Sequence, residues 1–84
     1  MAVNSKVRAM LNMKNRKPHE LAEYFGISAQ AMRNKISRNS FSSDDLIKVA
    51  DFLGCELSFI LSENQKITLD KSDLEPDTKD GETL

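Results

Sequence analysis

The sequence predicts a mainly α fold in which four short helices form one domain and a C-terminal β-hairpin follows. Apolar residues recur with helical spacing in four successive segments before Gly54, and a glycine or an asparagine ends three of them. After Gly54 apolar and polar residues alternate, which is typical of strands. With 84 residues the chain can form one hydrophobic core but not two.

The first two helices are marked by their apolar faces and by one proline. The first is expected to start near Asn4 or Ser5 and to end around Met13. The second is expected to begin at Pro18, which fits the first helical position, and to end at Gly26, which suits the left-handed conformation that closes many helices. The expected core-facing residues are Val3, Val7, Met10 and Leu11, followed by Leu21, Ala22 and Phe25.

Two serines mark the starts of the third and fourth helices. Ser28 is expected to cap a helix that runs to about Arg38 and stops at Asn39. Ser42 and Asp45 have the spacing of a capping box, so a fourth helix should follow Ser42 and end at Gly54. The expected core residues are Ile27, Met32 and Ile36 for the third helix, and Phe41, Leu46, Val49, Ala50 and Leu53 for the fourth.

Residues 56–70 are expected to form a β-hairpin with its turn at residues 62–65. A short fifth helix over residues 57–61 is the competing interpretation. A hairpin is marginal alone, so its apolar face should cover the open end of the helical core. Ile60 would point the other way, toward solvent or a second subunit, and the free strand edge could pair across a two-fold axis. The expected apolar face consists of Leu57, Phe59, Leu61, Ile67 and Leu69.

The charge is distributed unevenly along the chain. Residues 1–41 hold eight lysines and arginines and two acidic residues, whereas residues 42–84 hold four and eleven. A basic half followed by an acidic half suggests that the first half binds a polyanion, although two solvated faces of opposite sign would give the same totals. Residues 71–84 have two apolar residues among five acids and two lysines, so we expect a disordered acidic tail there.

Several classes of protein are disfavoured. No apolar run approaches the ~20 residues of a membrane span, and the N-terminus has no stretch of signal-peptide type, so we expect a cytoplasmic protein. Cys55 and His19 are the only cysteine and histidine, too few for a disulfide or a four-ligand zinc site. We therefore expect no metal and no cofactor. No nucleophile has an evident base, so we expect no enzyme, and Cys55 should be a half-buried apolar residue.

The second and third helices and the glycine turn between them have the register of a helix-turn-helix motif. Ala22 is small enough for the helices to cross closely, and Gly26 accepts a positive φ. This segment, ELAEYFGISAQAMRNKISR, and the later DLIKVADFLG resemble the phage-repressor and Cro-type helix-turn-helix family, also called the xenobiotic-response-element family. The resemblance covers about residues 5–55. It implies a helix-turn-helix DNA-binding domain over residues 1–55.

The sequence departs from the family pattern in three places. The family usually begins the second helix with a Thr or Ser cap and a Gln that contacts phosphate, but this chain has Lys17 and Pro18 there. In the third helix Lys35 takes the place of a buried apolar residue, and we expect the neighbouring Ile36 to make that core contact. After the fourth helix the family usually continues with another helix, whereas this chain alternates, which leaves the dimer interface open.

The outward face of the third helix lies opposite Met32 and Ile36 and is expected to contact DNA. It could also be the polar side of an ordinary surface helix, but residues 26–43 contain three cations and no acid. The expected base-contacting residues are Gln30, Arg33, Asn34 and Ser37. The expected phosphate-contacting residues are Lys14, Arg16, Lys17, His19, Ser28, Lys35, Arg38 and Asn39.

These observations predict a phage-related, sequence-specific regulator of transcription that binds double-stranded DNA. We expect a repressor that acts as a homodimer and reads the major groove with residues 28–38. The alternative is a protein-interaction module, similar to an antitoxin or an anti-repressor, whose acidic second half binds a basic partner.

Overall fold

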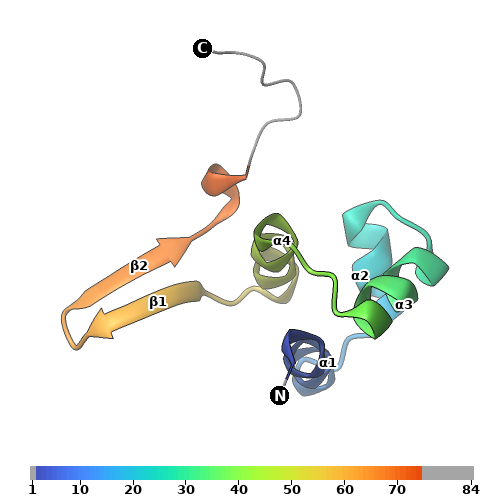
Figure 1. Ribbon diagram of the computed structural model, residues 1–84, viewed down its shortest axis with the longest axis horizontal. Helices are drawn as coiled ribbons and strands as arrows, with labels where there is room; N and C mark the ends of the chain where they lie inside the picture. Colours follow the sequence, from blue (N-terminus) through green and yellow to red (C-terminus); the bar gives the residue numbers. More distant parts are fainter. Residues whose placement is uncertain (1, 75–84) are drawn as a thin grey trace, which may run out of the picture.

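The computed structural model describes residues 2–74, which form four α-helices, a two-stranded sheet and one 3-10 turn (Figure 1). The predicted mainly α fold with a C-terminal hairpin is confirmed. The elements are α1 (Val3–Met13), α2 (Pro18–Phe25), α3 (Ala29–Arg38), α4 (Ser43–Leu53), β1 (Leu57–Ser62), β2 (Gln65–Leu69) and η1 (Lys71–Asp73).

The α3 and α4 helices start where the sequence places their caps, whereas α1 begins at Val3, just before the expected Asn4 or Ser5, with no side-chain cap. The Ser28 hydroxyl accepts the N–H of Ala31 at 3.0 Å at the start of α3. At the start of α4 the Ser42 hydroxyl accepts the N–H of Asp45 at 3.1 Å, and the Asp45 carboxylate accepts the N–H of Ser42 at 3.0 Å. These bonds satisfy donors that have no partner within the helix.

The α2, α3 and α4 helices are each followed by a residue in the left-handed conformation. Gly26, Asn39 and Gly54 follow these helices with φ values of 75°, 55° and 67°. This left-handed conformation favours glycine and is tolerated by asparagine, and it closes a helix without burying free carbonyls.

One apolar core lies between the helices. Val7 and Leu11 come from α1. Val3, at the first turn of α1, was expected to face the core but is 43% exposed, so this prediction is wrong. The first turn of α1 is held to α3 by the hydrogen bonds of Asn4 rather than by an apolar contact of Val3. The core cluster consists of Val7, Leu11, Leu21, Ala22, Met32, Ile36, Val49 and Leu53.

The α4 helix is buried on two sides. Val49 and Leu53 face the core as predicted, and Leu46 is half-buried against it. Ile47 is also buried, together with Ala50, where the chain after the hairpin returns to α4. A single apolar stripe does not predict Ile47, because its cover comes from a segment that is distant in sequence.

The two strands form an antiparallel hairpin, which excludes the alternative of a fifth helix. Phe59 pairs with Ile67, and Ile60 pairs with Lys66, so these two pairs lie on opposite faces. The register shifts between Ile60 and Ser62, which makes Leu61 the extra residue of a bulge.

The polar face of the hairpin is held together by one carboxylate. Glu56 accepts from the Lys66 ammonium at 2.7 Å, from the Thr68 hydroxyl at 3.2 Å and from the Ser58 hydroxyl. These three donors, the ammonium foremost, lower the pKa of Glu56 to about 2.

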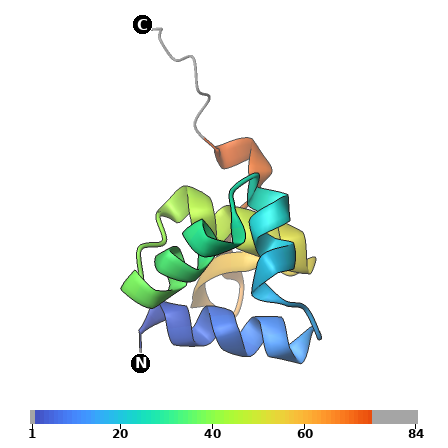
Figure 2. The same cartoon turned by 90° about the vertical axis from the view of Figure 1, so that its right-hand side faces the viewer.

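The apolar face of the hairpin does not cover the helical core, and this prediction is wrong. The hairpin projects from the helical body on the side away from α3 (Figures 1 and 2). On the apolar face only Leu57 and Leu69, at the base of the hairpin, are half-buried, whereas Phe59, Leu61 and Ile67 are 64%, 63% and 57% exposed. The helices leave no open end to cover, because half-buried residues of their own close the core. These are Met10, Phe25, Ile27, Phe41, Leu46 and Phe52.

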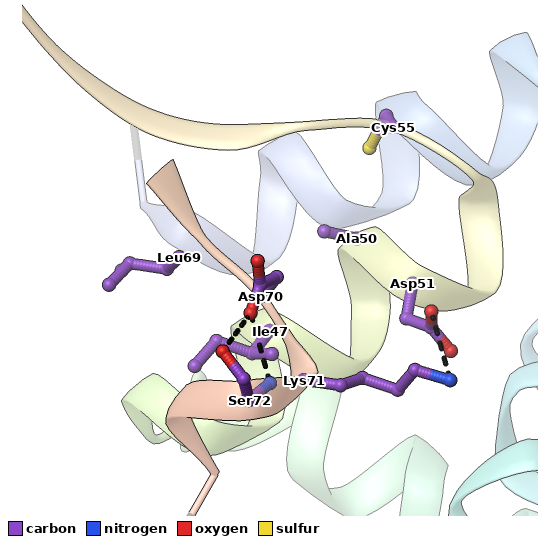
Figure 3. Close-up of a pocket in the computed structure, with 8 residues that line it drawn as sticks. All are labelled: Ile47, Ala50, Asp51, Cys55, Leu69, Asp70, Lys71 and Ser72. Atoms are coloured by element: carbon purple, nitrogen blue, oxygen red, sulfur yellow. Dashed lines mark hydrogen bonds and ion pairs between the residues drawn. The ribbon is translucent and has the colours of Figure 1, made fainter. Parts of the chain in front are cut away.

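After β2 the chain turns back onto α4 (Figure 3). Asp70 caps the η1 turn by accepting the N–H of Ser72 at 2.9 Å, and the Lys71 ammonium lies 3.7 Å from the Asp51 carboxylate of α4. Lys71–Asp73 are therefore ordered, contrary to the expectation of disorder from residue 71. The rest of the predicted acidic tail, residues 75–84, lies outside the described residues.

Cys55 is exposed rather than half-buried, because the chain leaves α4 for the hairpin there.

Candidate nucleic-acid interface

The turn between α2 and α3 fixes the angle of the two helices. After Gly26 the N–H of Ile27 donates back to the Ala22 carbonyl at 3.0 Å, which closes the end of α2. Ala22 and Met32 are buried between the helices. Because the side of α3 that carries Met32 is packed in the core, the opposite side of the helix faces solvent.

The exposed face of α3 carries a row of joined polar side chains. The Arg33 guanidinium donates to Gln30 Oε1 at 2.8 Å, and Gln30 Nε2 donates to Asn34 Oδ1 at 3.0 Å. Ser37 continues the row one turn further and is also exposed. The predicted base-contacting residues therefore lie together on one surface.

The hydrogen bonds within this row decide which groups remain for a ligand. The amide oxygen and one amide N–H of Gln30 are bonded to its neighbours. Most of the five N–H donors of Arg33, and the amide N–H donors of Asn34, stay available to a ligand. The face thus presents mainly donors. Donors fit the O6 and N7 acceptors of guanine in the major groove.

A groove beside α3 adds a residue that the sequence did not single out. Arg8 of α1 lines it together with Pro18 of α2 and Arg33, Ile36 and Ser37 of α3. Arg8 follows the buried Val7, and helical spacing alone does not say which flank of α1 faces α3. The structure brings this cation next to the exposed face of α3.

The position of α1 is held by two asparagines. The backbone N–H of Asn4 donates to Asn39 Oδ1 at 2.8 Å, and Asn4 Nδ2 donates to the Ile36 carbonyl at 2.8 Å. The first turn of α1 is thereby fixed to the last turn of α3. Asn39 keeps its amide N–H groups for another partner.

The predicted phosphate-contacting residues divide into two groups. Six of them are exposed side chains around α3 and the start of α2: Lys14, Lys17, His19, Ser28, Arg38 and Asn39. The other two are half-buried and form ion pairs within the chain. The Arg16 guanidinium donates to Glu20 at 3.1 Å and lies 4.3 Å from the ring centre of Phe52. The Lys35 ammonium lies 2.9 Å from Asp45 of α4.

The sequence model of the bacteriophage CI repressor helix-turn-helix domain matches residues 2–67. The chain belongs to this family. The match covers the four helices and continues through β1 into β2. No curated protein and no solved structure matches the chain.

The CI-type domain is a DNA-binding, transcription-regulating domain, and its family consists of regulators rather than enzymes. None of its helices within residues 2–74 is long and apolar enough to cross a membrane. Within the same residues no three histidine, cysteine or acidic side chains are grouped as metal ligands.

Two carboxylates of the CI-type domain have lowered pKa values that reflect its helix starts. The Lys17 N–H and the Arg16 guanidinium both donate to Glu20 and lower its pKa. Burial opposes ionisation of Asp45, but the Ser42 N–H and the Lys35 ammonium outweigh it, so the pKa of Asp45 is also lowered. Glu20 therefore caps the start of α2 by accepting the Lys17 N–H, because the usual Ser or Thr cap is missing there.

Proposed function

We propose that this chain is a transcriptional repressor that binds a specific double-stranded DNA site as a homodimer. Each copy places α3 in a major groove, with Gln30, Arg33, Asn34 and Ser37 toward the base edges. The observation that carries the proposal is the joined, exposed and acid-free row on α3, on the side opposite the buried Met32 and Ile36.

Base discrimination follows from the donors on this face. A guanidinium can donate to both guanine acceptors, and a carboxamide can pair with adenine or donate to a purine N7. Arg33 is the residue expected to discriminate most strongly, because arginine forms the commonest specific contact with guanine.

Phosphate contacts would orient the domain on the duplex. Lys14, Lys17 and His19 lie before or at the start of α2, and Ser28 lies at the start of α3, where free backbone N–H groups also favour anions. Arg38 and Asn39 lie at the other end of α3, and Arg8 lies beside the groove. Phosphates along both edges of the groove would then fix the register of α3.

The acidic half of the chain supports a single orientation on DNA. The hairpin projects on the side away from α3, and η1, which carries Asp73, follows it. Negative charge there would repel the duplex unless α3 is seated. The same acidic surface is the one that a basic protein partner would contact, which is the second candidate interaction.

Selection of duplexes from a random pool tests the proposal. We expect an inverted repeat whose half-sites are centred about one helical turn, or a multiple of it, apart. Recovery of no preferred sequence, with equal affinity for all duplexes, would reject sequence-specific regulation.

A further inference from the structure

Among the large apolar residues within residues 2–74, those of the hairpin have the highest exposed fractions, apart from Met13 on α1. Phe59 and Ile67 are cross-strand partners and are 64% and 57% exposed, and Leu61 beside them is 63% exposed. The charged residues Glu56 and Lys66 are bonded to each other through the opposite face. One face of the hairpin is therefore apolar and free of charged pairs.

We propose that two copies of the chain pack against each other through this face, the hairpin face, which consists of Phe59, Leu61 and Ile67. The proposal deepens the two-copy DNA binding proposed above and depends on it for its purpose, but self-association is a property that can be measured without DNA.

Three observations favour a second copy over other occupants. The helical core is already closed by its own residues, so the hairpin face cannot be reserved for it. Residues 75–84 hold one large apolar residue, Leu84, among four acids, so they offer no apolar strip that would match the face. A basic protein would choose the acidic groups rather than a face without charge. A second copy supplies an identical apolar face, as a two-fold contact requires.

The position of the hairpin is compatible with DNA binding by such a pair. The strands extend from α4 on the side away from α3 (Figures 1 and 2). If the two-fold axis runs along the hairpin between two stacked faces, the α3 helices of both copies lie at the same end of the dimer. Both could then meet one side of a duplex.

The small size of the face sets the strength of the contact. A standard interface buries about 800 Å² on each partner, and a few side chains supply less than this. We therefore expect association in the micromolar range, which becomes stronger when two adjacent half-sites hold the copies together.

Sedimentation equilibrium of the full chain, without DNA, over about 1–500 µM tests this inference. Wild type should show a monomer–dimer equilibrium, and Phe59→Thr with Ile67→Thr should weaken it by about tenfold or more. Threonine keeps the strand propensity, and circular dichroism at micromolar concentration should show the wild-type helix content. Ile60→Thr is the matched control, because Ile60 is 76% exposed on the opposite face of the same hairpin.

Isotope-filtered NOEs between labelled and unlabelled copies give a second readout, with contacts from the Phe59 ring to the other copy. A wild type that stays monomeric at 500 µM, or an equal effect of Ile60→Thr, would overturn the assignment. Dimerisation through the hairpin face without any DNA preference would refute the proposed function and leave this inference standing. A specific DNA complex together with self-association that is unchanged in the double variant would do the reverse.

Discussion

Gln30 is hydrogen-bonded to two residues that lie one turn further along the exposed face of α3. Its amide oxygen accepts from Arg33 and its amide nitrogen donates to Asn34, at 2.8 and 3.0 Å. A long arginine side chain loses much rotamer freedom when it binds a base, and a neighbour that already orients it reduces this cost. Gln30 is therefore expected to influence more than its own contact.

Substitution in this row should affect specific sites selectively. Arg33→Ala should cost about 1–3 kcal/mol on the selected site and relax the preference at one base position. Gln30→Ala should also broaden the guanine preference that Arg33 creates. Fluorescence anisotropy against a panel of single-base variants measures both effects. Equal losses on specific and random duplexes would contradict the assignment of these residues to bases.

Lys35 is expected to stabilise the fold rather than to contact a DNA phosphate. Its ammonium pairs with Asp45 at 2.9 Å, and both side chains are largely buried, with 25% and 15% exposed. Lys35→Met keeps the aliphatic stem and removes the charge, so it should lower the melting temperature and leave the salt dependence of DNA binding unchanged. A normal melting temperature with a shallower salt slope would assign Lys35 to phosphate instead.

The start of α4 makes stability depend on pH. The folded pKa of Asp45 lies below its unfolded value, so its carboxylate contributes stability that is fully present above about pH 4–5 and is lost as the pH falls through the folded pKa. Asp45→Asn should reduce the free energy of unfolding at pH 7 by about 1–2 kcal/mol. Wild type and variant should converge at low pH in urea titrations.

Asp44→Asn is the matched control for this prediction. Asp44 lies in the same first turn of α4 but makes no side-chain hydrogen bond among the described residues. It should change stability little. A difference between wild type and Asp45→Asn that stays constant from pH 7 to pH 2 would contradict the role of the Asp45 charge.

The helices could be predicted from the sequence because their signals are local. Ser28, Ser42 and Gly26 act on backbone groups within a few residues, and the structure places the helix boundaries where these residues indicate. The row on α3 follows from the same helical spacing. Whether these side chains contact bases stays a prediction, because no local pattern encodes a ligand.

Long-range packing could not be predicted in the same way. The alternation of the hairpin indicates an apolar face but not what lies against it, so its packing on the core was a wrong prediction. The partner of Lys35 and the cover of Ile47 come from other elements, Asp45 and the chain after β2. Arg8 reaches the α3 groove because Val7 and Leu11 pack α1 into the core and Asn4 bonds it to Asn39.

Across the whole molecule, the cations of the basic half should make DNA binding strongly dependent on salt. Arg16 and Lys35 have internal partners, so about four or five phosphates per copy remain to be neutralised by the basic half. Counterion release then predicts a slope of log K against log salt of about −4 per copy. Binding titrations between 50 and 200 mM salt measure it, and a flat response would favour the basic protein partner.

Chemical methylation of guanine N7 on the selected duplex tests the central claim most directly, because N7 lies in the major groove. With the site saturated by wild type, one guanine in each half-site should be protected. With the site saturated by Arg33→Ala, the same guanine should react as in free DNA. Guanines that stay reactive under saturating wild type, or protection that is unchanged by Arg33→Ala, would contradict the placement of α3 in the major groove.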